Sequence, residues 1–459
     1  MKKIGRYTLT GRLGRGGMSS VYKARAPVTG RTVALKILKP RDDIFIDLVG
    51  EERLKEIFVE EAKIMGEITH DHIAKIIDCD ESDGTPFIIL EYFAHSIGAL
   101  IGEAYILEKP SRVMSINKAY LYLRQTLLGL ERLHFAGIVH RDLKPYNLMI
   151  TNDDRIKIID FGLSRIRGEE KMAIPGMQVG SPYYAAPEQE QDPQNADERA
   201  DLYSVGVMAY RLITGMLVSH KQNDIEPPST RNSDVTDEWD TFLLKSIDRD
   251  PDKRFNSAQH MRLQLDGLYT EWKRQSQKSC TFIASDQAGA DVATRSLRSS
   301  PAFIKVQELR RALELDPLMR PKAYVPHRFQ YRSTILLECL DTGLIWQRKA
   351  AGFMLTWDKA HEYIAYLNDR CWQGSDCWRL PTAEELHSLL RPPTRERDFC
   401  FDAYFAEEVH WIWSCDTCSK NMAWTVDIQE SFFQELDKDG AASVCAVTSL
   451  EEPVDEGCL

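Results

Sequence analysis

Two short stretches decide the fold of the first part of the chain: His140-Arg141-Asp142-Leu143-Lys144-Pro145-Tyr146-Asn147 and Asp160-Phe161-Gly162. Phosphoryl transfer needs a carboxylate that positions the attacking hydroxyl group, together with oxygen ligands that hold Mg²⁺ on the phosphates. Asp142, Asn147 and Asp160 are residues of these types in that order. The apolar runs 148–150 and 156–159 predict two short strands, which would fix the two stretches relative to each other.

The bulk properties exclude several classes of protein. A chain of 459 residues is too long for one ordinary core and predicts two domains. Its formal net charge of -11 argues against a nucleic-acid partner, because surfaces that bind nucleic acids are basic. The N-terminus lacks the apolar stretch of a signal peptide, and no run of about 18 apolar residues occurs. We therefore expect a cytoplasmic protein without a membrane span.

A glycine-rich turn lies near the N-terminus. The segments 7–13 and 20–24 alternate as the strands of a hairpin do, and Gly14, Gly16 and Gly17 lie between them. Glycines in such a turn let backbone N–H groups approach a phosphate. Because glycine-rich hairpin turns without this function are common, the turn alone does not identify a phosphate site.

A lysine and a glutamate further along form a second candidate pair. Lys36 lies in the apolar strand 33–36, where its ammonium group needs a partner. A helix predicted for residues 51–67 carries Glu61, which offers that partner. Taken singly, each residue has a simpler interpretation. Lys36 could extend its ammonium group into solvent from an edge strand, and Glu61 could lie on a solvated helix face. The catalytic-type motifs described above favour the pair.

Together, these motifs resemble those of the Hanks-type, eukaryotic-like serine/threonine protein kinases of bacteria, over residues 7 to about 270. The resemblance implies a two-lobed protein kinase fold that transfers the γ-phosphate of ATP, with Mg²⁺, to serine and threonine hydroxyls of protein substrates. The catalytic residues it implies are Asp142, Lys144, Asn147, Lys36 and Glu61, with Asn147 and Asp160 as the Mg²⁺ ligands. The nucleotide-binding residues it implies are Leu13, Gly14, Arg15, Gly16, Gly17, Val21, Ala34, Lys36, Glu91 and Phe93.

The resemblance also assigns supporting roles and shows departures. Asp201 would bind the backbone of the catalytic loop, and Arg254 would pair with Glu188. Ser19 stands where the glycine-rich loop of the family has its third glycine. A pseudokinase scaffold is the rival interpretation, but Lys36, Asp142 and Asp160 are all retained, which favours an enzyme.

Two segments of this region are unusual. The segment 163–180 holds no threonine and no central serine that could carry an activating phosphate. Three alternatives follow: Glu169 or Glu170 supplies the negative charge of that phosphate, regulation comes from elsewhere in the chain, or packing alone orders the loop. The segment 97–116 is longer than the family needs. It is either an insertion that selects partners or, as we expect, a solvated loop.

The rest of the chain differs in composition. Residues 271–330 predict a linker with a short helix, because they are rich in polar residues and interrupted by prolines. Residues 331–450 hold Gly343-Leu344-Ile345-Trp346 and Trp378-Arg379-Leu380-Pro381-Thr382, and they resemble the Lcl C-terminal domain family. This resemblance implies a small α+β, C-type-lectin-like domain that senses or binds an unknown ligand.

Nine of the ten cysteines lie at or beyond position 280. Cys371, Cys377, Cys415 and Cys418 have three interpretations: a zinc site, a redox-active pair, or ordinary packed and free thiols. Five residues separate Cys371 from Cys377, more than the two to four that zinc sites commonly show, and the third interpretation is favoured.

Overall fold

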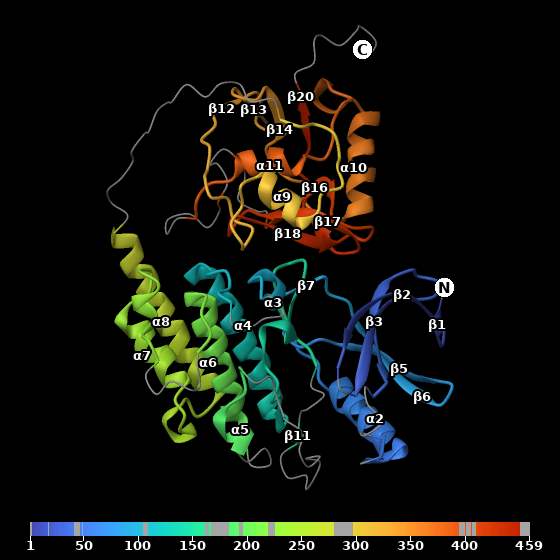
Figure 1. The fold of residues 1–459 in the computed structure, drawn as a ribbon, viewed down its shortest axis with the longest axis vertical. Helices are drawn as coiled ribbons and strands as arrows, with labels where there is room; N and C mark the ends of the chain where they lie inside the picture. The colour runs from blue at the N-terminus through green and yellow to red at the C-terminus, as the bar shows by residue number, and fades with distance from the viewer. Residues whose placement is uncertain are drawn as a thin grey trace. The chain divides into compact units, whose positions relative to one another are not determined.

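The computed structural model describes residues 2–16, 18–40, 46–47, 49–103, 109–160, 165–166, 183–191, 196–218, 225–279, 297–393, 400, 405 and 410–449. The chain divides into two compact units, Met1–Trp272 and Lys273–Leu459 (Figure 1). Each unit is described by itself.

The first unit begins with a six-stranded antiparallel sheet in the order β1-β2-β3-β4-β6-β5. Its strands are β1 (Lys3–Ile4), β2 (Tyr7–Arg15), β3 (Ser19–Arg25), β4 (Thr32–Leu38), β5 (Ile76–Ser82) and β6 (Thr85–Glu91). Helix α2 (Glu51–Glu67) has the bounds that the apolar spacing predicts. Its buried side chains Leu54, Phe58 and Ala62 pack against Leu38 and Ile88 of the sheet, so the helix covers this face of the sheet.

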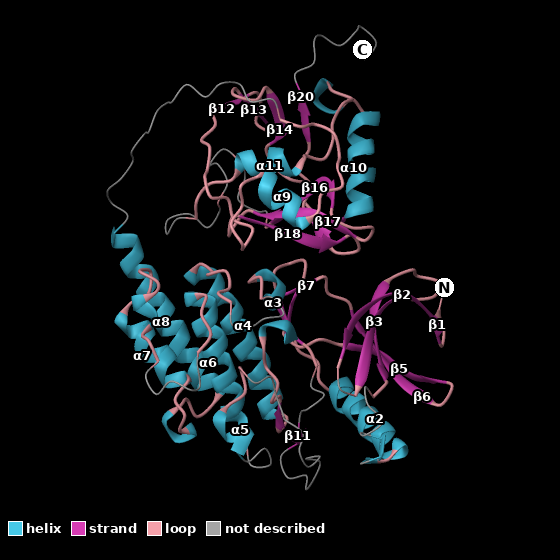
Figure 2. Ribbon diagram, viewed as in Figure 1, coloured by secondary structure: helices cyan, strands magenta, loops and turns pink. Residues whose placement is uncertain are grey.

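The remainder of the first unit is mainly helical (Figure 2). Its helices are α3 (Ile97–Leu100), α4 (Ile116–Phe135), α5 (Pro187–Gln191), α6 (Glu198–Thr214), α7 (Asp237–Ser246) and α8 (Ala258–Ser279), with the 3-10 turns η1 (Pro145–Asn147), η2 (Pro228–Thr230) and η3 (Pro251–Lys253). Its short strands are β7 (His95–Ser96), β8 (Ile138–Val139), β9 (Leu148–Ile150), β10 (Ile156–Ile158) and β11 (Arg165–Ile166). Helix α6 is buried from Ala200 to Thr214 and forms the centre of this lobe.

In its described residues, the second unit combines small sheets with short helices. Its sheets have the orders β12-β13-β14-β20, β15-β19 and β16-β17-β18. The strands are β12 (Phe329–Tyr331), β13 (Leu336–Cys339), β14 (Leu344–Gln347), β15 (Leu355–Thr356), β16 (Trp411–Thr417), β17 (Met422–Asp427), β18 (Phe432–Asp437), β19 (Ala441–Ala442) and β20 (Val447–Ser449). The helices are α9 (Val306–Ala312), α10 (Trp357–Asp369) and α11 (Ala383–Leu389), with the 3-10 turn η4 (Trp372–Gly374).

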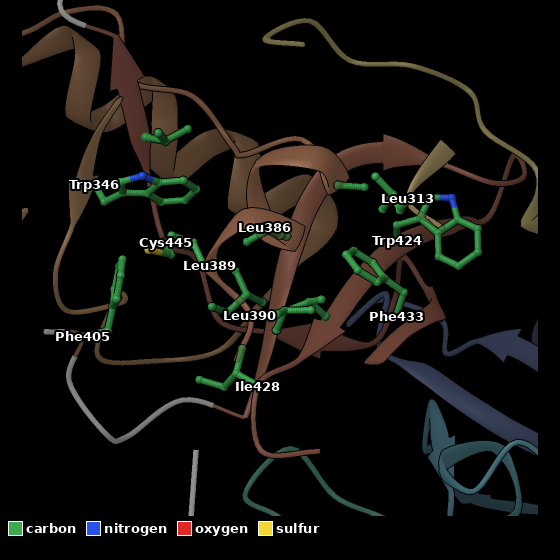
Figure 3. Close-up of a cluster of buried hydrophobic side chains, with 14 of the residues drawn as sticks. Leu313, Trp346, Leu386, Leu389, Leu390, Phe405, Trp424, Ile428, Phe433 and Cys445 are labelled. Atoms are coloured by element: carbon green, nitrogen blue, oxygen red, sulfur yellow. The ribbon is translucent and has the colours of Figure 1, made fainter. Parts of the chain in front are cut away.

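One apolar core joins these elements of the second unit. Leu386 and Leu389 of α11 lie in this core with Trp346 of β14, Trp424 of β17 and Phe433 of β18 (Figure 3). All five side chains are buried.

The prediction of a linker over 271–330 is wrong for its second half. Leu309 and Leu313 belong to the same buried core as the tryptophans. Arg298 forms a bidentate ion pair with the fully buried Asp416, at 2.8 and 2.7 Å. Asp416 also accepts the N–H of Ala302 at 2.8 Å. Residues 298–330 are therefore a structural part of the second unit. The start of the predicted linker is also helical, because helix α8 continues to Ser279.

Candidate active site

Two short strands position the catalytic-type motifs. The strands β9 and β10 pair antiparallel, with Leu148 opposite Ile158. Asn147 is therefore the residue before β9, and Asp160 lies two residues after the end of β10. The Ile159 N–H donates to the Asn147 carbonyl at 3.0 Å, which ties the two ends together. This confirms the predicted strand pair.

Asp201, at the start of the buried helix α6, holds the backbone of the loop. Its Oδ2 accepts hydrogen bonds from the His140 N–H and the His134 ring, both at 2.9 Å, and its Oδ1 accepts the Arg141 N–H at 2.8 Å. Burial would raise the pKa of Asp201, but these donors outweigh it and hold that pKa below its usual value. The predicted contact between Asp201 and the loop is confirmed.

The loop brings Asp142, Lys144 and Asn147 together. The Lys144 ammonium donates to Asp142 Oδ2 at 2.8 Å. Asn147 Nδ2 donates to the Asp142 carbonyl oxygen at 2.7 Å. With its Nδ2 held in this way, the amide oxygen of Asn147 is the atom available to a cation. One carboxylate, one ammonium group and one amide oxygen thus lie within a single turn of backbone.

Lys36 on β4 lies between two carboxylates. Its ammonium donates to Glu61 of α2 at 2.9 Å and to Asp160 at 2.8 Å. Burial favours the neutral amine, but the two carboxylates outweigh burial and raise the pKa of Lys36. The charge of Lys36, in turn, lowers the pKa of Asp160. Lys36 and Asp160 are therefore charged at neutral pH. The ion pairs of Lys36 connect the sheet, helix α2 and the segment after β10.

The predicted nucleotide-binding residues that the structure describes lie on adjacent strands of the same sheet. Gly14 on β2 is opposite Val21 on β3, and Ala34 on β4 is opposite Leu90, the residue before Glu91. The Gly16 N–H donates to the Ser19 carbonyl at 2.8 Å and closes the turn. The other members of the set are Leu13 and Arg15 at the end of β2, and Phe93 just after β6. Gly17 lies outside the described residues.

A bidentate ion pair joins helix α5 to the residue that follows the turn η3. Arg254 donates to both carboxylate oxygens of Glu188, at 2.6 and 2.8 Å. The Arg254 side chain is fully buried and also contacts the carbonyl oxygen of Arg199 at 3.1 Å. The prediction that Arg254 pairs with Glu188 is confirmed.

Glu103 is a buried residue whose importance the sequence did not reveal. Its Oε1 accepts the Tyr184 hydroxyl at 2.7 Å and lies 3.4 Å from Nη1 of the buried Arg211. Its carbonyl oxygen accepts the hydroxyl of Tyr146, which belongs to the catalytic-type loop. Burial raises the pKa of Glu103 despite the nearby guanidinium. Glu103 thus links three distant segments of the chain.

This arrangement corrects the prediction of a solvated loop at 97–116. The residues Ile97, Leu100 and Ile101 are buried, and Arg112 donates to the Leu100 carbonyl at 2.6 Å. Residues 104–108 are outside the described range. The described ends of the segment are part of the lobe, and Glu103 at one of them accepts the hydroxyl of Tyr184.

Several predictions fall outside the described residues. They concern Phe161, Gly162 and the segment 167–182, which includes Glu169 and Glu170. The proposed replacement of an activating phosphate by one of these glutamates stays a prediction.

The four cysteines considered for zinc do not gather. Among the residues that the structure describes, the group of His, Cys, Asp or Glu side chains close enough to share a metal ion is a different one, His327, Cys339 and Asp341. Burial raises the pKa values of Cys415 and Cys418 to about 12. Because the thiolate is the reactive form, these thiols are poorly suited to redox chemistry at neutral pH. Ordinary packed or free thiols are the interpretation that remains, because Cys415 and Cys418 are buried and Cys377 is exposed.

Comparisons with known proteins agree with this geometry. Residues 7–265 match the family described as "Protein kinase domain", and residues 339–448 match the "Lcl C-terminal domain". Because the first match covers more than half of the chain, the chain belongs to the protein kinase family. The predicted two-lobed kinase fold, followed by a separate α+β region, is confirmed; the C-type-lectin-like relationship stays a prediction.

The curated relatives are bacterial kinases. The chain is 35% identical over 276 residues to serine/threonine-protein kinase PksC of Streptomyces coelicolor, covering 56% of this chain and 48% of the relative. It is 30% identical over 277 residues to serine/threonine-protein kinase PknB of Mycolicibacterium smegmatis, covering 57% and 42%. The chain therefore spans about half the length of the curated relatives it matches. The crystal structure of the Mycobacterium tuberculosis PknI kinase domain aligns with a TM-score of 0.45 and 23% identity, covering 58% of this chain and 98% of that one.

Proposed function

We propose that this chain transfers the γ-phosphate of ATP to serine and threonine hydroxyl groups of proteins. The strongest support is the position of Lys36 between Glu61 and Asp160, in a chain that also keeps Asp142 and Lys144 in contact. The lysine and proline after Asp142 resemble serine/threonine kinases, and the named relatives favour the same specificity.

In this proposal the side chains have separate tasks. Asp142 would orient the attacking hydroxyl group and accept its proton. Lys144, held at 2.8 Å from Asp142, would place its positive charge beside the γ-phosphate. Lys36 would bind the α- and β-phosphates, and Glu61 would keep its ammonium group in place. The residues of β2, β3, β4 and the chain after β6 would enclose the nucleotide.

The residues present also suit Mg²⁺. The donors are the Asp160 carboxylate, which is ionised because Lys36 lowers its pKa, and the amide oxygen of Asn147. Oxygen donors of this kind are those that Mg²⁺ prefers. When bound, the ion neutralises charge on the β- and γ-phosphates.

The test is phosphate transfer from labelled ATP to a generic basic protein, with mapping of the modified residues. Asp142→Asn and Asp160→Asn are expected to lower the rate by about 10²-fold or more. Asp80→Asn, the same change at an exposed position on β5, is the control and is expected to leave the rate unchanged. A wild-type chain that is folded, binds ATP and transfers no phosphate would instead indicate a scaffold.

For the second unit, we propose a binding module that regulates the kinase or recruits its substrate. This is supported by the match of residues 339–448 and by the separate core described above. We place the kinase domain at 7–270 and extend the module from the predicted 331–450 to begin near Arg298. Truncation after Ser279, rather than at 331, is therefore the informative deletion. A changed rate on the generic substrate indicates regulation, and a change on the native substrate alone indicates recruitment.

Where the protein acts in the cell stays a prediction. In the described parts of the chain, no helix has the length and apolar character needed to cross a membrane. A cytoplasmic location is tested by fractionating cells that produce the tagged chain.

A further inference from the structure

Three side chains with metal-binding atoms meet at one edge of the second unit, in a place unrelated to the proposed kinase chemistry. They are His327, Cys339 and Asp341, whose nitrogen, sulfur and oxygen atoms all lie within 4.8 Å of one another. The Cys339 side chain is 1% exposed. The side chains of His327 and Asp341 are 6% and 3% exposed. The group is therefore shielded from solvent.

The backbone explains why these residues converge. Strands β12 and β13 pair antiparallel with Phe329 opposite Cys339. The Leu340 N–H donates to the Arg328 carbonyl at 2.9 Å, so the same register continues beyond the strand ends. That register sets His327 opposite Asp341, and Cys339 lies two residues away. Residues two apart, and residues opposite each other, share a face of a sheet. All three side chains thus come to one side.

The distance between His327 and Asp341 fits a shared ion better than a direct hydrogen bond. His327 Nδ1 lies 3.7 Å from Asp341 Oδ2, which is longer than a hydrogen bond. Two ligands at about 2.1 Å from a tetrahedral ion are separated by about 3.4 Å. A small movement of either side chain would bring both atoms to coordination distance.

The orientation of the Asp341 carboxylate is fixed by its hydrogen bonds. The Arg328 guanidinium donates to Asp341 Oδ1 at 2.8 and 2.5 Å, and the Arg328 N–H donates to Oδ2 at 2.6 Å. Partners of this kind hold the ligands of protein metal sites in place. A bound dication would receive negative charge from the Cys339 thiolate and would share the Asp341 carboxylate with Arg328.

We propose that His327, Cys339 and Asp341 bind a transition-metal dication, and that Zn²⁺ is the ion that fits. The reason for Zn²⁺ is the donor set, because one sulfur, one nitrogen and one oxygen suit Zn²⁺ and not Mg²⁺ or Ca²⁺. Three protein ligands leave a fourth position for water or another small ligand. This site is separate from Cys371, Cys377, Cys415 and Cys418.

The test uses the full-length chain after removal of metals by chelation. Titration with Co²⁺ is expected to give one tetrahedral ion per chain, with visible absorption and a near-ultraviolet band from sulfur-to-cobalt charge transfer. One equivalent of Zn²⁺ is expected to remove both signals. Cys339→Ser should abolish the charge-transfer band, and Asp341→Asn should weaken Co²⁺ binding at least tenfold. Cys377→Ser, at an exposed thiol outside the group, is the control and should leave the spectrum unchanged.

Two results would overturn the proposal. One is a wild-type chain that shows no tetrahedral Co²⁺ spectrum; this result needs no variant and so does not depend on how the variants fold. The other is a charge-transfer band that persists in Cys339→Ser, or that disappears in Cys377→Ser, because the thiolate would then come from elsewhere. In either case the group is an ion pair between Arg328, Asp341 and His327 with a buried thiol beside it. Neither readout depends on kinase activity.

Discussion

Glu103→Gln removes one negative charge from a buried cluster and leaves its shape nearly unchanged. The Glu103 and Arg211 side chains are each 1% exposed, so that the guanidinium loses a compensating charge that water cannot replace. Breaking one partner of a buried ion pair costs about 3–5 kcal/mol. The amide oxygen keeps the hydrogen bond from Tyr184, and Arg211 still reaches the Lys109 carbonyl at 3.4 Å. Because burial nevertheless raises the pKa of Glu103, the native state favours the neutral side chain, and we expect Glu103→Gln to lower the unfolding free energy by at most about 0.5 kcal/mol at pH 7.

The assay is urea unfolding of residues 1–279, monitored by the fluorescence of Trp239 and Trp272. Glu81→Gln, the same change at an exposed site on β5, is the control and should alter stability by less than about 0.5 kcal/mol. A Glu103→Gln variant that loses about 3–5 kcal/mol would refute the reasoning, because it would mean that Arg211 depends on this charge.

The same variant has a pH signature. Burial raises the folded pKa of Glu103 above its ordinary value of 4.5, so the native state holds this proton more tightly than the unfolded chain. The contribution of Glu103 to stability is fully present below pH 4.5 and is lost as the pH rises through the folded pKa. The unfolding free energy of the wild type minus that of Glu103→Gln, measured as a function of pH, should isolate this decrease. A difference that rises with pH in that range would contradict the sign.

Three further predictions concern other parts of the chain. Leu309→Ala should lower the unfolding free energy of the second unit by about 2–4 kcal/mol, whereas Val306→Ala, at an exposed position on the same helix, should have little effect in thermal scans. Arg254→Lys loses the bidentate geometry and should cost about 2 kcal/mol in urea unfolding, while unaltered stability would show that a single contact suffices. With a thiol reagent at pH 8, mass spectrometry should find Cys377 modified quickly. Cys415, whose pKa burial raises to about 12, should react only after unfolding.

The catalytic-type groups could be predicted because the chemistry fixes their residue types within short motifs. Asp142 and Asn147 lie five residues apart, and Asp160 follows after one predicted strand pair. The contact between Lys36 and Glu61 was also accessible, because strand and helix periodicity placed both residues on buried elements. In each case, local pattern and reaction chemistry pointed to the same residue.

The remaining features depend on contacts between distant residues. Glu103 meets Tyr184 across 81 positions, and the polar residues around it resemble those of a solvated loop. Arg298 meets Asp416 across 118 positions. Leu309 belongs to the short helix that was predicted within the linker, but seven residues of sequence do not show that this helix joins the core of the second unit. Such residues gain their roles from tertiary packing, which local propensity does not encode.

The left-handed backbone at Arg141 has a consequence for turnover. Its φ is 67°, a conformation that costs a non-glycine residue about 1–2 kcal/mol. Asp201 stabilises it by accepting the Arg141 N–H, and the Arg141 guanidinium is held by the Ala196 carbonyl at 2.9 Å. The loop is thus ordered during folding, and its conformational entropy is not lost again each time a substrate arrives. Hydrogen exchange at residues 139–147 should be equally slow with and without nucleotide.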